Sequence, residues 1–205
     1  PVEWPLEHWS SLDAYQLPPA PPEAGPDVDL ARQRVAKERE TYYTLGGFGQ
    51  LFELLRALRP FEKVLMDLVD DNPVYLEIMQ ARFEFFYETQ RRTLEAAGGL
   101  IDFCHAGDDF GNQRGPMISP SIFDRHFASK YRCYFDMVHA HNARTMLHMC
   151  GCCEAFLPRL VDLGLDVYDV VQPTTPSMDI AVLARNCGEG LTFCGSVCVQ
   201  TTLAW

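Results

Sequence analysis

Short apolar segments alternate with segments of helical periodicity along most of the chain, and this alternation constrains the fold more than any other feature. Segments of strand length lie at 42–45, 100–104, 143–149, 167–171 and 191–194. Helices are predicted at 29–40, 50–59, 61–70, 73–97, 120–141, 154–163 and 179–186. Apolar strands that alternate with helices form a parallel sheet with helix-covered strands. The sequence therefore predicts an α/β fold.

Polar side chains that can take part in chemistry follow the ends of successive predicted strands. They are Asp108 and Asp109 after the second strand, His148 and Cys150 at the third, Gln172 after the fourth, and residues 195–200 after the fifth. Such convergence on one edge is typical of a (β/α)8 TIM barrel. No glycine-rich phosphate-binding motif follows a strand, which disfavours a dinucleotide-binding sheet.

The chain is short for a complete barrel. It has 205 residues, whereas such barrels have about 250 or more. Only five of eight strands are predicted, so we expect an incomplete barrel whose N-terminal and C-terminal strands lie outside this chain. Residues 1–28 are rich in proline but carry apolar anchors such as Trp4 and Leu6, which indicates a leader packed on the body. Residues 29–205 would form the partial barrel domain.

The amino-acid composition restricts the kinds of molecule that the chain is expected to bind. The net charge of −11 argues against nucleic acid or an anionic membrane as a partner, and favours a small molecule or another protein. No apolar run approaches the roughly 18 residues of a spanning helix, and no signal-peptide pattern is seen, so a cytoplasmic location is expected. The eight cysteines lie mostly in apolar runs, as expected of reduced thiols. A homo-oligomer is left open.

His148 and Cys150 are the strongest candidates for metal ligands. They are separated by one residue at the end of an apolar run. Residues two apart on a strand share a face, so the imidazole and the thiolate can bind one cation, and zinc prefers such ligands. The alternative is that both side chains are ordinary core residues.

The loop at 107–115 holds two adjacent carboxylates, Asp108 and Asp109, which are predicted to be catalytic. Neighbouring side chains point in different directions, so only one of them is expected to face a pocket, while the other caps the loop or pairs with Arg114. A purely structural turn is the alternative. Gln113, Gln172 and Gln200 are predicted to bind substrate, with backbone capping as the alternative for Gln172. His105 follows an apolar segment and is assigned no role.

Several segments in order along the chain resemble the uroporphyrinogen decarboxylase superfamily. They are FEKVLMDL at 61–68, GDDFGNQRGPMISP at 107–120, LHMCG at 147–151, Gln172 with Pro173, and FCGSVCVQ at 193–200. This superfamily has a (β/α)8 barrel and two main chemistries. One is cofactor-free decarboxylation of uroporphyrinogen, and the other is zinc-dependent methyl transfer between corrinoid proteins and thiols.

The His-x-Cys-Gly segment is similar to the zinc motif of the methyltransferase branch. The resemblance implies a zinc enzyme that works with a corrinoid carried by a partner protein, and with His148 and Cys150 as ligands. The third ligand of that branch, a cysteine on the last strand, would lie beyond Trp205, so Cys152 or Cys153 is a candidate for a local substitute. The alternative for these two cysteines is that they are small apolar fillers at the start of a helix. A uroporphyrinogen decarboxylase of porphyrin biosynthesis and a non-catalytic barrel remnant acting as a binding subunit remain as alternatives.

Overall fold

The computed structural model describes residues 4–16, 27–47, 49–198 and 201–203. Within them, five strands form one sheet in the order β1-β2-β3-β4-β5, and every neighbouring pair is parallel. The strands are β1 (Leu45–Gly46), β2 (Phe103–Gly107), β3 (Arg144–His148), β4 (Val167–Val171) and β5 (Thr192–Gly195). The predicted α/β fold with a parallel sheet is confirmed. The described residues do not close the sheet into a complete barrel.

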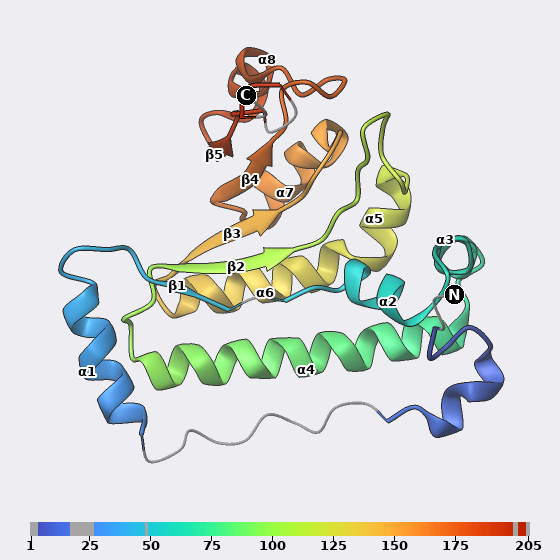
Figure 1. Cartoon of the computed structure of the whole chain (residues 1–205), viewed down its shortest axis with the longest axis horizontal. Coiled ribbons are helices and arrows are strands. Elements are labelled where there is room, and N and C mark those ends of the chain that lie inside the picture. The colour runs from blue at the N-terminus through green and yellow to red at the C-terminus, as the bar shows by residue number, and fades with distance from the viewer. Residues whose placement is uncertain (1–3, 17–26, 48, 199–200, 204–205) are drawn as a thin grey trace.

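Helices connect and cover the strands (Figure 1). They are α1 (Val28–Glu38), α2 (Phe52–Leu58), α3 (Phe61–Val69), α4 (Pro73–Ala97), α5 (Pro120–His126), α6 (Ala128–Ala140), α7 (Leu157–Leu163) and α8 (Ile180–Cys187), with 3-10 turns η1 (Trp9–Ala14) and η2 (Glu154–Phe156). Helices α4 and α6 pack against each other, and α6 also packs against β3. Among the described helices, none combines the length and the apolar character that a membrane crossing requires.

The longest helix, α4, begins and ends where its sequence predicts. The side chain of Asn72 accepts hydrogen bonds from the backbone N–H groups of Val74 and Tyr75, and Pro73 occupies the first turn. Gly98 ends the helix in the left-handed conformation with φ 60°, which glycine adopts without the steric cost that other residues meet.

The two faces of the sheet differ in burial, and the difference places the candidate site. Thr145 and Leu147 of β3 are fully buried on the helix-covered face. Met146 and His148 alternate with them and are only partly buried. Five parallel strands in chain order resemble a barrel segment, because right-handed connections put all helices on one side. The opposite face therefore carries the accessible side chains.

Strand β2 lies three residues later than predicted, at 103–107 instead of 100–104. The reason is a hydrogen-bonded junction that fixes the chain before the strand. The carboxylate of Asp102 accepts from the backbone N–H of Thr44 at 2.9 Å and from Arg39 at 2.6 Å. As a result, His105 lies within the strand instead of following it. The helix predicted at 120–141 is likewise divided, because it is interrupted at Phe127.

Residues 4–16 of the predicted leader contact the body. Leu6 is 1% exposed, and its backbone N–H donates to the carbonyl oxygen of Leu58 at 2.8 Å. The guanidinium of Arg59 lies 3.9 Å from the ring centroid of Trp9 and donates to the carbonyl of Leu6. Apolar burial and a cation–π contact thus attach this segment beside α2 and α3. The rest of the leader lies mostly outside the described residues.

Candidate metal centre

The register of the parallel strands brings distant polar residues into one line across the sheet. Gly107 pairs with His148, His148 with Asp169, and Asp169 with Cys194. Paired residues of parallel strands project to the same face, which here is the face with partly buried side chains. His105, two residues before Gly107 on β2, projects to that face as well. The polar residues therefore meet at the carboxyl ends of β2, β3 and β4.

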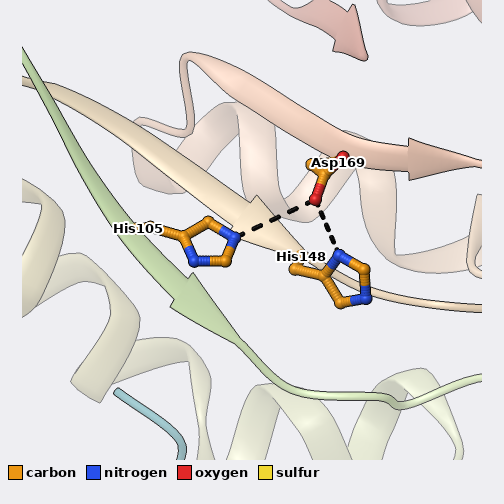
Figure 2. Close-up of side chains that lie close together, drawn as sticks. All are labelled: His105, His148 and Asp169. Atoms are coloured by element: carbon orange, nitrogen blue, oxygen red, sulfur yellow. Dashed lines mark hydrogen bonds and ion pairs between the residues drawn. The ribbon is translucent and has the colours of Figure 1, made fainter. Parts of the chain in front are cut away.

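His148 is held between two partners, one at each ring nitrogen. Its Nδ1 lies 2.7 Å from Oδ2 of Asp169, and its Nε2 lies 3.2 Å from Sγ of Cys150. The carboxylate of Asp169 interacts with both imidazoles (Figure 2). Nε2 of His105 lies 3.9 Å from Oδ2 of Asp169, the same oxygen that contacts His148. With Nδ1–H donating a hydrogen bond to the carboxylate of Asp169, the ring presents a lone pair at Nε2 toward Cys150.

Cys150 lies among carboxylates. Its backbone N–H donates to Oδ1 of Asp109 at 2.6 Å. Burial, together with the charges of Asp109, Asp169 and Glu53, raises the pKa of the Cys150 thiol to about 11. A thiolate would therefore be disfavoured here without a cation beside it, because several negative charges would be close together.

Among the residues that the structure describes, two groups of side chains have donor atoms within 4.8 Å of one another, and both include His148. One is Asp109, His148 and Cys150, and the other is His105, His148 and Asp169. Zinc binds sulfur at about 2.3 Å and nitrogen at about 2.0 Å, so ligand atoms a few ångströms apart can share one ion. The first group provides the nitrogen, sulfur and oxygen donors that zinc accepts. It uses Nε2 of His148, which leaves Asp169 to orient the ring through Nδ1.

The two adjacent aspartates have different environments. Asp108 is 1% exposed, and its carboxylate accepts from the backbone N–H groups of Leu51 and Glu53 at 2.9 Å and from the hydroxyl of Tyr131 at 2.5 Å. Burial raises the pKa of Asp108 to about 7, against these hydrogen bonds, which lower it. Asp108 thus fixes the start of α2, and only Asp109 has its carboxylate beside Cys150.

A cavity of about 360 Å³ adjoins the donors. Its lining includes His105, His148, Asp109, Gln50 and Glu53. A larger hollow of about 700 Å³ lies between α1, β1 and the end of α4. That larger hollow contains neither group of potential metal ligands. The smaller cavity is therefore the candidate for chemistry.

Of the glutamines predicted to bind substrate, Gln113 and Gln172 lie in contact. Oε1 of Gln172 accepts from the backbone N–H of Gly151 at 3.0 Å and from Nε2 of Gln113 at 3.3 Å. Both glutamines line a small cavity of about 100 Å³. Gln172 therefore holds the turn that follows Cys150. This role corresponds to the alternative in which Gln172 caps the backbone instead of binding substrate. Gln200 lies outside the described residues.

The proposed substitutes for a third ligand point elsewhere. Sγ of Cys152 donates to the carbonyl of Pro176 at 3.0 Å, and Sγ of Cys153 donates to the carbonyl of Cys150 at 3.1 Å. Both cysteines are buried. Asp109 is instead the third donor beside His148 and Cys150.

Sequence reasoning missed Asp169, Glu53 and the position of His105. One signal for Asp169 was available, because a carboxylate stands at the centre of the otherwise apolar strand 167–171. A charge inside a parallel strand is costly unless it has a partner. Nothing local in the sequence indicates that Glu53 reaches the same cavity.

Comparisons with known proteins show a fold and no family. No family model matches the chain, and no curated protein matches it. Among solved structures, a methyltransferase from Methanosarcina mazei is similar, with a TM-score of 0.50 and 18% sequence identity. The match covers 70% of this chain and 42% of that chain, so this chain spans less than half of that protein's length.

Proposed function

We propose that this chain is part of a zinc-dependent methyltransferase of the uroporphyrinogen decarboxylase superfamily, which moves a methyl group between a corrinoid protein and a thiol. The observation that carries the proposal is the convergence of His148, Cys150 and Asp109 beside a cavity at the carboxyl edge of a parallel sheet. The His-x-Cys-Gly motif and the similarity to a methyltransferase fold support it.

In this proposal, Nε2 of His148, Sγ of Cys150 and a carboxylate oxygen of Asp109 hold the ion. Bound zinc would lower the pKa of an acceptor thiol, so that the nucleophilic thiolate is present at neutral pH. Asp169 keeps the proton of His148 on Nδ1. Asp108 acts by holding α2, whose residue Glu53 lines the cavity.

The methyl transfer itself requires no further reactant. A methylcorrinoid would serve as the methyl donor: the thiolate sulfur would form a bond to the methyl carbon, and the electron pair of the broken cobalt–carbon bond would stay on cobalt. The proton of the acceptor thiol is released to solvent. The partly buried face of the sheet, where His105 and His148 lie, is the side from which a corrinoid-carrying partner would reach the cavity.

The decarboxylase alternative has less support from the cavity. A substrate with several acetate groups requires cationic side chains, and the described lining of this cavity contains no lysine or arginine. A non-catalytic binding subunit would not require a nitrogen–sulfur–oxygen donor set.

The proposal is tested by incubating zinc-loaded protein with methylcobalamin and a panel of small thiols, and measuring cob(I)alamin and methyl thioether formed. We expect Cys150→Ser and His148→Ala to lower the rate about 100-fold or more, and Cys133→Ser, an exposed cysteine of α6, to leave it unchanged. Undiminished activity in Cys150→Ser would contradict the proposal. Metal-free protein that decarboxylates uroporphyrinogen would support the alternative.

A further inference from the structure

The charges around the cavity beside the candidate metal centre are of one sign. Two of its acidic lining residues, Glu53 and Asp109, can present negative charge to it, because the carboxylate of the third, Asp108, accepts hydrogen bonds from Leu51, Glu53 and Tyr131. The lining within the described part of the chain includes no lysine or arginine. His105 of β2 also lines the cavity, and its ring packs beside that of His148.

One guanidinium, that of Arg56, pairs with a residue of the cavity lining. Arg56 forms an ion pair with Glu53, and its guanidinium carbon lies 4.7 Å from the ring centroid of Phe61. Arg56 also lines a separate hollow together with Trp4, Phe61 and Glu53 itself, but it does not line the cavity beside the candidate metal centre. It therefore moderates the charge of Glu53 without presenting a cation to the cavity.

An ion held by Asp109, His148 and Cys150 would not reverse this sign. A divalent cation is balanced by one thiolate and one carboxylate, and an acceptor thiolate then adds a further negative charge. Asp169 contributes another negative charge through its hydrogen bond to His148. A substrate tail that is also anionic would meet repulsion from Glu53 and from the loaded centre, whereas a cationic tail would be attracted.

We propose that the thiol bound at this site is a small aminothiol, with its sulfur toward Cys150 and His148 and its ammonium group toward Glu53. Thiols that carry a sulfonate or carboxylate are discriminated against. This inference rests on the proposed function, because it assumes that the three donors hold a metal and that a thiol approaches it.

The test uses protein loaded with Co²⁺ in place of zinc, which gives visible absorption bands without any turnover. Three thiols of equal length are titrated: 2-aminoethanethiol, 2-mercaptoethanol and 2-mercaptoethanesulfonate. The sulfur-to-cobalt charge-transfer band reports binding, and each dissociation constant is corrected for the thiol's own pKa in free solution. We expect the ammonium thiol to bind tightest and the sulfonate weakest, with about a tenfold difference or more between them.

Two variants test whether Glu53 causes the preference for the ammonium thiol. Glu53→Gln should reduce the difference between the ammonium and sulfonate thiols to about twofold. Glu95→Gln, which removes a carboxylate on α4 that pairs with Arg91, is the matched control and should leave the difference unchanged. Equal or tighter binding of the sulfonate thiol overturns the inference, as does a preference that persists in Glu53→Gln.

Failure of the inference can be told apart from failure of the proposed function. If Co²⁺ gives tetrahedral bands that are lost in Cys150→Ser, and thiols bind without a charge preference, only the aminothiol inference is wrong. If Co²⁺ gives no such bands, the metal centre itself is wrong, and the inference is overturned with it.

Discussion

At the scale of single residues, two neighbouring side chains hold the imidazole of His148 in its orientation. Its imidazole lies 3.2 Å from Cys150 on one side and 2.7 Å from Asp169 on the other. The contact with Cys150 follows from their two-residue spacing and could be predicted from the sequence. The contact with Asp169 depends on strand register across 21 residues of sequence, and no local pattern specifies that register.

Asp169 is expected to act as a positioning residue for His148. Replacing it by asparagine removes the negative acceptor at Nδ1, so the ring loses its fixed tautomer and orientation. We expect Asp169→Asn to lower zinc affinity about 10-fold to 100-fold, measured by competition with a chromophoric chelator. Asp136→Asn, an exposed position of α6, is the control. Unchanged affinity in Asp169→Asn would show that the carboxylate does not orient the ligand.

Asp108 is expected to stabilise the fold. Asp108→Ala leaves the N–H groups of Leu51 and Glu53 and the hydroxyl of Tyr131 without their acceptor in a buried site. We expect the free energy of unfolding to fall by about 2–4 kcal/mol. Urea unfolding of metal-free protein at pH 7 measures this loss without interference from a ligand. Asp136→Ala should change it little, and an equally small change in Asp108→Ala would refute the structural role.

At the scale of elements, sequence periodicity located the strands and helices better than their ends. The apolar run at 100–104 suggested a strand, but the junction made by Asp102 and Thr44 delays β2 to Phe103. Hydrogen bonds between segments 58 residues apart in sequence determine this boundary. Hydrophobic periodicity does not report such long-range contacts, which is also why His105 was assigned no role.

The junction before β2 should depend on pH. The hydrogen bond from Arg39, followed by those from Thr44, holds the pKa of Asp102 below its usual range. A depressed pKa in the folded state contributes stability above the unfolded pKa of about 4, and this stability is lost as the pH falls through the folded value. Asp102→Asn should therefore cost about 1–2 kcal/mol at pH 7.

The cost of Asp102→Asn should shrink as the pH is lowered from about 4 toward 3. Urea unfolding of both proteins across this range measures the difference. Asp29→Asn on α1, whose carboxylate is largely exposed, serves as the control. A cost that stays constant down to pH 3 would show that the charge of Asp102 is not what holds the junction.

At the scale of the whole molecule, the alternation of apolar and helical segments predicted the parallel sheet and its five strands. Each parallel connection needs an intervening helix, so the chain order alone specifies much of the topology. The alternation does not specify closure into a ring, because closure depends on what pairs with the outer edges of β1 and β5.

The central claim is that His148, Cys150 and Asp109 bind one metal ion. X-ray absorption spectroscopy at the zinc edge, together with elemental analysis of purified protein, tests it most directly. The account predicts about one zinc per chain with a single sulfur ligand at about 2.3 Å and the remaining ligands nitrogen or oxygen, and loss of the metal in His148→Ala. Protein without zinc after reconstitution, or zinc whose sulfur ligand persists in Cys150→Ser, would contradict it.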